Sequence, residues 1–304
     1  MIPVRRLAWA LIPLVGLIEL GAHFFLSQRA PDPSEWRGLA PTVTQLRKAQ
    51  ELVVVAPYWA EPNARAAFGD ALMPVNHVAR PDESAFSRAI EVSIVGADAP
   101  ELAGWQLEHE EHIDGFRLRV LSNSTPAAVK FNFVDNLKPE YAAVSERGQQ
   151  PCPWNPKARV TNGALDRGHA TFPEQRFDCK GKDWHFAGVT VVEDQNYRPR
   201  RCIWAQPTNG GALHVSFENV ALGSRIYGYS GSSYFLERTT KQPMELEARV
   251  NDRAIGKHVH DHRAGWTHFN FAVESAAQPT GNVTFIVRPL QGKSNPLCFY
   301  ADSR

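Results

Sequence analysis

The sequence predicts an α+β protein with three parts: an N-terminal transmembrane helix, a small α/β domain and a C-terminal antiparallel β-sandwich. An apolar run near the N-terminus predicts the first part, mixed strand and helix patterns the second, and strict alternation of apolar and polar residues the third. A chain of 304 residues can hold two domains of ordinary size. We expect a signal anchor over residues 1–28, a linker over 29–41, the α/β domain over 42–123 and the sandwich over 127–304.

Alternating segments in the second half predict the sandwich. In one of them, Leu213, Val215 and Phe217 alternate with polar neighbours. A period of two places one set of side chains on a buried face and the other in water. Turn-rich gaps separate these segments, as in an antiparallel sandwich. Further strands are expected over residues 129–134, 184–192, 244–250, 269–273, 283–287 and 297–301.

Composition and cysteine usage narrow the class of protein. Hydrophobic content is 43%, and the net charge of +1 gives no indication of a nucleic-acid partner. The four cysteines show no CxxC spacing, which disfavours a cysteine zinc site, and we expect no cofactor. In an exported chain they would form two disulfides, of which Cys202–Cys298 and Cys152–Cys179 are the favoured pairs. The alternative is four buried free thiols.

The apolar run over residues 7–26 is about as long as a bilayer core is thick. Arg5 and Arg6 precede it, and no short, small-residue cleavage region follows, so an uncleaved signal anchor is favoured over a cleaved signal peptide. The expected disulfides favour a body outside the cytoplasm, periplasmic or extracellular. We therefore predict that the protein is anchored in a membrane and that its body lies outside the cytoplasm.

Two ionisable residues lie inside this run. Glu19 and His23 are four residues apart and share one helix face. Such groups are costly in hydrocarbon without a partner, so they are candidates for docking a second membrane protein. The alternative is that both reach the outer interface and extend into water.

Strand and helix patterns between residues 41 and 123 predict the α/β domain. Helices are expected over 41–49, 61–72 and 86–95, with Asp82 as a cap of the third. The segments 51–57 and 75–78 are predicted strands, which would form a parallel pair. A hairpin is expected over 105–109 and 116–121, joined by Asp114-Gly115.

The segment ELVVVAPYWAEPNARAAFGD at residues 51–70 resembles a strand–loop–helix of the extracytoplasmic parts of polyprenyl-phosphate-sugar glycosyltransferases. It contains no catalytic motif, and those enzymes have many membrane spans where this chain has one. The resemblance therefore implies at most a role beside such an enzyme.

The C-terminal hundred residues resemble a galactose-binding-like jelly roll. The resemblance is in the strand pattern of Cys202-Ile-Trp, residues 213–217, residues 265–269 (GWTHF) and Cys298-Phe-Tyr. It implies a jelly-roll form of the sandwich. Proteins of that fold often bind glycans on exposed loops, and some only scaffold.

A glycine- and serine-rich segment at residues 228–232 (GYSGS) is flanked by tyrosines and is interpreted as a rim loop of the sandwich. Aromatic rings can pack on the apolar face of a sugar while polar groups orient it. The alternative for each aromatic is ordinary packing, and Trp266 in particular could fill the core. The candidate ligand-binding residues are Tyr229, Tyr234, Arg238, Asp261, His262 and Trp266.

Three alternate histidines, His258, His260 and His262, would share one face of a strand and could converge on a metal. The pattern resembles the HxHxDH motif of metallo-β-lactamase-type hydrolases but lacks one residue of its spacing. The favoured alternative is a solvated strand end, so no metal site is predicted.

The sequence thus favours a non-enzymatic role: binding or scaffolding at the cell envelope, with a glycan or a membrane protein as partner. No complete catalytic set is present. Three alternatives stay open: a metal-dependent hydrolase, a carboxylate glycosidase and a structural subunit of a larger membrane assembly.

Overall fold

The computed structural model describes residues 4–27, 31–148, 150–160, 171–179, 184–261, 263–274 and 279–304. It divides into two compact units. Unit 1 consists of Met1–His77 and Phe86–Pro126, and unit 2 consists of Val78–Ala85 and Ala127–Arg304. Unit 2 therefore includes an eight-residue segment that lies within the sequence span of unit 1.

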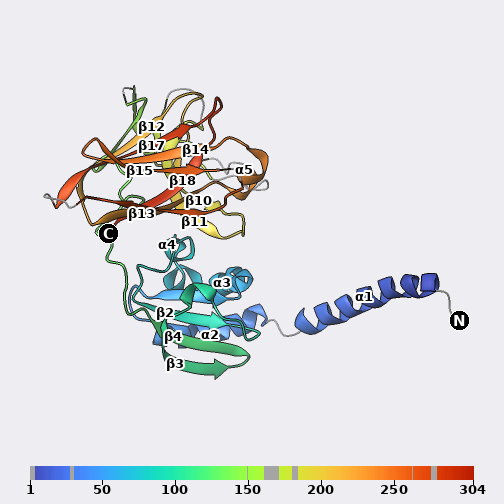
Figure 1. Cartoon of the computed structure of the whole chain (residues 1–304). Coiled ribbons are helices and arrows are strands. Elements are labelled where there is room, and N and C mark those ends of the chain that lie inside the picture. The colour runs from blue at the N-terminus through green and yellow to red at the C-terminus, as the bar shows by residue number, and fades with distance from the viewer. Residues whose placement is uncertain are drawn as a thin grey trace. The chain divides into compact units, whose positions relative to one another are not determined.

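The first helix, α1, spans Val4–Ser27 and includes Pro13 (Figure 1). Within the described part of the chain, no helix combines the length and apolar character that membrane crossing requires, so the transmembrane prediction for residues 7–26 is not supported. Glu19 is exposed on α1, and the side chain of His23 lies outside the described residues. The exposed large apolar residues of this helix are Leu11, Ile12, Leu14, Val15, Leu17, Ile18 and Leu20.

Unit 1 is built on a four-stranded sheet in the order β1-β2-β4-β3, with β1 parallel to β2. Trp36 of α2 packs edge-on against Phe68 of α3 and Phe116 of β4, at 5.9 and 4.8 Å between ring centroids. These contacts place both helices on one face of the sheet. The elements are α2 (Pro33–Leu46), β1 (Leu52–Ala56), η1 (Tyr58–Ala60), α3 (Glu61–Leu72), α4 (Val75–Val78), β2 (Arg88–Ser93), η2 (Pro100–Leu102), β3 (Gln106–Ile113) and β4 (Phe116–Ser122).

The 105–121 hairpin is present, and residues 52–56 belong to a parallel pair, but their partner is 88–93 and not the predicted 75–78. Three further predictions in unit 1 are wrong. Helix α2 begins at Pro33 because Asp32 and Glu35 form a capping box, so most of the expected linker is helical. Residues 75–78 form a helical turn instead of a strand. The expected helix over 86–95 is strand β2, because its apolar residues are buried between β1 and β4.

Unit 2 is the antiparallel β-sandwich, and together with the helices it makes the fold α+β. One sheet has the order β16-β13-β18-β11-β10-β9-β8, with β5 beside β18, and the other has the order β15-β14-β17-β12-β6-β7 (Figure 1). The elements are β5 (Phe131–Asn132), β6 (Ala142–Glu146), β7 (Gln150–Cys152), β8 (Trp154–Asn155), β9 (Arg176–Asp178), β10 (Phe186–Glu193), β11 (Pro199–Ala205), β12 (Leu213–Ala221), β13 (Arg225–Gly231), α5 (Tyr234–Thr239), β14 (Met244–Val250), β15 (Arg253–His260), β16 (Thr267–Ala272), β17 (Thr280–Pro289) and β18 (Leu297–Ser303).

The sandwich core lies between the two sheets. Phe285 of one sheet packs against Phe299 of the other at 5.1 Å and against Phe133 at 4.9 Å. Leu213, Val215 and the other inward residues of the alternating segments belong to the same buried cluster. The apolar residues of these segments therefore alternate because one face of each strand is buried in the core.

Both favoured disulfides are present. Cys202–Cys298 links β11 to its neighbour β18, and Cys152–Cys179 links the end of β7 to the residue after β9. Cross-links of this kind limit the unfolded chain and typically stabilise a fold by about 2–4 kcal/mol each.

The rim-loop interpretation of residues 228–232 is wrong. Most of this segment belongs to β13, which is paired with β16 on one side and β18 on the other. Gly228 is required there because a Cβ would collide with the carbonyl oxygen of Tyr300. Only Ser232 lies beyond the strand, directly before α5.

Candidate functional site

The predicted ligand-binding residues do not gather at one place. Tyr234 and Arg238 lie on α5, whereas Tyr229 lies on β13 and stacks on Trp266, with ring planes 3° apart. Asp261 is exposed just after β15. His262 lies outside the described residues.

Half-buried Tyr234 and exposed Arg238 form a surface together with a residue that the sequence analysis missed, Tyr197. The Tyr197 side chain is 57% exposed, in the turn between β10 and β11, and its ring centroid lies 5.0 Å from that of Tyr234. The Arg238 guanidinium lies over the Tyr234 ring, 4.6 Å from its centroid. We call Tyr197, Tyr234 and Arg238 the aromatic ledge.

One buried carboxylate holds both segments that carry the ledge. Glu237 of α5 is 2% exposed, and its Oε1 lies 2.5 Å from His260 Nε2 and accepts the backbone N–H of Ser232 at 3.0 Å. Its Oε2 accepts the side-chain amide of Gln195 at 3.3 Å. Because Gln195 lies in the same turn as Tyr197, Glu237 fixes the turn and the helix to β15 together. We call Glu237, Gln195, Ser232 and His260 the Glu237 cluster.

Several buried polar atoms around this cluster have no hydrogen-bond partner within the described part of the chain. They are Ser230 Oγ, Ser233 Oγ, His260 Nδ1 and Trp266 Nε1. Buried polar atoms are nearly always paired in folded proteins. The polar interior behind the ledge is therefore incompletely satisfied.

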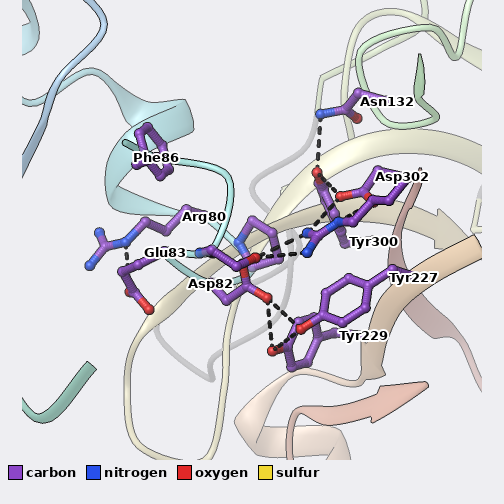
Figure 2. Close-up of polar contacts among 12 residues, drawn as sticks. Arg80, Asp82, Glu83, Phe86, Asn132, Tyr227, Tyr229, Tyr300 and Asp302 are labelled. Atoms are coloured by element: carbon purple, nitrogen blue, oxygen red, sulfur yellow. Dashed lines mark hydrogen bonds and ion pairs between the residues drawn. The ribbon is translucent and has the colours of Figure 1, made fainter. Parts of the chain in front are cut away.

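A second polar cluster surrounds Asp82, in the segment of unit 2 that precedes β2 (Figure 2). Asp82 Oδ2 accepts hydrogen bonds from the Tyr227 hydroxyl at 2.7 Å and the Tyr229 hydroxyl at 3.0 Å. Its Oδ1 accepts the Ser84 backbone N–H at 3.0 Å and lies 3.8 Å from the Arg304 guanidinium, which covers the Tyr227 ring. We call these five residues the Asp82 cluster.

The Asp82 cluster continues through further pairs on β18 and β5. Arg304 donates to both carboxylate oxygens of Asp302, at 2.6 and 2.9 Å. The Tyr300 hydroxyl donates to Asp302 at 3.0 Å and accepts from the Asn132 amide at 3.3 Å (Figure 2). This network ties residues 78–85 to the sandwich.

Electrostatics keep the Asp82 cluster in one protonation state near neutral pH. Burial raises the pKa of Tyr227 to about 12, and burial together with the Tyr227 hydrogen bond raises the pKa of Tyr229 further. Burial opposes ionisation of Asp82, but hydrogen bonds from Ser84 and Tyr227 outweigh it, so the Asp82 pKa lies below its usual value. The phenols therefore remain donors and Asp82 remains an acceptor, which is the chemistry of a structural contact.

The predicted solvated histidine strand end is wrong for His260, which is 6% exposed and paired with Glu237. His258 lies within hydrogen-bond distance of Thr267 Oγ1 at 3.0 Å. Burial, with smaller effects of His260 and His268, lowers the pKa of His258 to about 4. The described residues contain no group of three His, Cys, Asp or Glu side chains placed to hold a metal ion.

Comparison with known proteins gives matches only among solved structures: no family model matches the chain, and no curated protein does. One match is the CBM51 carbohydrate-binding module of Clostridium perfringens GH95 in complex with methyl-galactose, 6% identical, covering 38% of this chain and 81% of that one at a TM-score of 0.28. Another is TmCBM61 in complex with β-1,4-galactotriose, 10% identical, covering 58% and 96% at 0.27.

A third match is the structure of CBM51-2 in complex with GlcNAc and INT domains from Clostridium perfringens ZmpB, 8% identical at a TM-score of 0.32. The match covers 66% of this chain and 41% of the ZmpB structure. TM-scores this low say nothing about the ligand of this chain.

Proposed function

We propose that the sandwich is a non-enzymatic glycan-binding module and that the aromatic ledge is its binding surface. The observation that carries the proposal is the exposed Tyr197 ring, held beside Tyr234 and next to the Arg238 guanidinium. An exposed aromatic ring can pack on the apolar face of a sugar ring, and an adjacent cation can orient its polar substituents.

The fixing of the ledge by Glu237 supports this function. Binding is weakened when side chains and loops must be ordered at the moment of association. Here a buried carboxylate links the turn that carries Tyr197 to the helix that carries Tyr234, through Gln195 and His260. The two rings are thus positioned before a ligand arrives, which distinguishes the ledge from two mobile tyrosines.

We further propose that the protein works outside the cytoplasm, attached to the cell envelope through α1. Two disulfides are typical of an oxidising compartment. Leu14 and Ile18 are exposed one helical turn apart on α1, and apolar residues occur on its other faces as well. A helix of this composition suits a membrane surface or an apolar partner helix, for which Glu19 and His23 remain candidate docking residues.

Isothermal titration of the full chain with an array-selected oligosaccharide tests the binding surface. We expect Tyr197→Ala and Tyr234→Ala each to lower the affinity about tenfold, because each removes ring contact with the sugar. Tyr141→Ala is the matched control, since Tyr141 is 47% exposed and does not belong to the ledge. Equal affinities of the wild type, both ledge variants and the control would exclude the ledge as the binding surface.

Sedimentation with phosphatidylcholine vesicles tests the role of α1 separately. We expect the wild-type chain to sediment with the vesicles and the double variant Leu14→Lys, Ile18→Lys to stay in the supernatant, because two charges interrupt the apolar surface. Leu107→Lys is a control at an exposed apolar residue of β3. Sedimentation of the double variant at the wild-type level would rule out attachment through α1.

A further inference from the structure

We infer that the aromatic ledge selects a sugar that carries a carboxylate, such as a uronic acid, and that Arg238 is the residue that recognises it. This inference rests on the proposed glycan-binding function and adds the chemical class of the ligand. It depends on three properties of Arg238: its lack of a carboxylate partner, its stacking on Tyr234 and the inward orientation of neighbouring acids.

Arg238 differs from two arginines of β11, Arg200 and Arg201, in its ion pairing. Arg200 is paired with Asp194 at 2.9 Å, and Arg201 donates to Asp135 at 2.5 Å. Arg238 is exposed, and no carboxylate of the described residues forms an ion pair with it. Its charge is therefore available to a ligand.

Stacking on Tyr234 gives the Arg238 guanidinium a defined orientation. The guanidinium carbon lies over the ring, 4.6 Å from its centroid, so the ring limits the directions that the group can take. The N–H groups lie in the guanidinium plane and are directed away from its faces, where they can donate to two oxygens of one carboxylate. A planar, preoriented donor pair of this kind recognises a carboxylate better than a sugar hydroxyl.

The acidic residues next to Arg238 and in the Tyr197 turn, Glu237 and Asp194, do not neutralise the positive charge of Arg238. Glu237, next to Arg238, is turned inward to His260, and Asp194, in the turn that carries Tyr197, is turned inward to Arg200. Lys241 is exposed after the end of α5 and adds a second positive charge, while Glu193 is the exposed acid at the end of β10. The positive charges of Arg238 and Lys241 thus favour an anionic ligand.

Ring positions place a ligand carboxylate within reach of Arg238. Tyr197 and Arg238 both lie next to the Tyr234 ring, one 5.0 Å away between ring centroids and the other over its face. The Tyr197 ring centroid and the Arg238 guanidinium carbon are therefore less than about 10 Å apart, so an oligosaccharide held on Tyr197 can extend to the guanidinium. We expect the carboxylate of a uronic acid, which projects from the edge of the sugar ring, to meet the N–H groups there.

The experiment compares oligogalacturonides with carboxyl-reduced oligomers of the same length, by calorimetric titration of the full chain. We expect the acidic oligomer to bind about tenfold more tightly at low salt, and this preference to fall as salt rises. Arg238→Gln should lower the affinity for the acidic oligomer about tenfold more than the affinity for the reduced oligomer, so that the preference is lost. Arg238→Lys, which keeps the charge without the planar donor pair, should retain only part of it. Arg253→Gln is the matched control, because Arg253 is exposed and paired with exposed Glu274.

The outcomes separate this inference from the proposed function. Equal affinity for the two oligomers, with loss of both in Tyr197→Ala, would overturn carboxylate recognition and leave glycan binding in place. An acidic preference that persists in Arg238→Gln would overturn the role of Arg238. Absence of binding to either oligomer, with no array hit that depends on Tyr197, would overturn both.

Discussion

The Asp82 and Glu237 clusters each use a carboxylate to fix a segment onto the same sandwich, yet they differ in how many of their polar atoms have partners within the described residues. Around Asp82, two phenols, a serine and a guanidinium all have partners. Around Glu237, Ser233 Oγ and His260 Nδ1 have none within the described residues. A satisfied network rigidifies a fold, whereas the Glu237 carboxylate links the turn of Tyr197 and helix α5 to β15. The comparison indicates a structural role for the first cluster and a positioning role for the second.

Removing the Asp82 carboxylate should have the largest effect on stability. Asp82→Ala leaves two tyrosine hydroxyls without their shared acceptor and removes the ion pair with Arg304, and we expect a loss of about 3 kcal/mol in the free energy of unfolding. Urea unfolding followed by tryptophan fluorescence measures it. Asp70→Ala, at an exposed ion pair with Arg65, should change stability by less than about 0.5 kcal/mol.

The contribution of Asp82 to the free energy of unfolding should also depend on pH. Because the pKa of Asp82 is lowered from 3.8 in the folded protein, the ionised carboxylate stabilises the fold above this pH, and the contribution is lost as the pH falls through the lower, folded-state value. The stability difference between the wild type and Asp82→Asn should therefore shrink below about pH 4. A difference that grows on acidification would contradict the assigned direction.

Removing the Glu237 carboxylate should lower the free energy of unfolding less than removing the Asp82 carboxylate does, and it should lower the glycan affinity more. Glu237→Ala leaves His260, Gln195 and the Ser232 N–H without their acceptor, for which we expect about 2 kcal/mol. Loss of the shared acceptor should also loosen the ledge, which nuclear Overhauser effects between the Tyr197 and Tyr234 rings report without any ligand. Glu237→Gln keeps an acceptor and should retain part of the ring contacts. Unchanged ring contacts in Glu237→Ala would remove the positioning role.

Acidification should lower the free energy of unfolding through His258, near the Glu237 cluster, at a higher pH than it does through Asp82. The pKa of His258 is lowered from 6.5 to about 4, so the unfolded chain binds a proton there before the folded chain does. Stability is therefore lost as the pH falls from 6.5 towards 4. Chemical unfolding across this range should show a shallower loss for His258→Asn than for the wild type, with His112→Asn, an exposed histidine, as the control.

The smallest expected effect on stability is that of the ledge surface itself. Tyr197→Ala removes an exposed ring, so the free energy of unfolding should change by less than about 0.5 kcal/mol although glycan affinity falls. Thermal unfolding measured beside the binding titration separates the two quantities. A large loss of stability would show that Tyr197 supports the fold and would weaken its assignment to the ledge.

Local patterns explain what could be predicted from the sequence. The alternation at Leu213, Val215 and Phe217 comes from one strand with one buried face, so no knowledge of distant residues was needed. The hairpin turn at Asp114-Gly115 is local in the same way, and both residues have positive φ values of 44° and 86°. The segment 86–95 was misassigned because burial between two strands, which is a tertiary property, determined its structure.

The candidate site was predicted only in part because its contacts are distant in sequence. Asp82 and Tyr227 are 145 positions apart, and a helix cap was the only role that the sequence around Asp82 indicated. Tyr234 and Arg238 were identified from composition, whereas Tyr197 was missed. The cluster Asp194-Gln-Asn directly before Tyr197 is typical of a tight turn, and an aromatic residue in such a turn is a signal that could have identified it.

The membership of residues 78–85 in unit 2 has a consequence for dissecting the protein. A fragment that starts at Ala127 would contain every strand of the sandwich and both disulfides but would lack Asp82. Tyr227 and Tyr229 would then lose the acceptor that they share, and Arg304 would lose an ion pair. We therefore expect the sandwich to be expressed in a stable form only when the chain before it is included or when a peptide of residues 78–85 is supplied in trans.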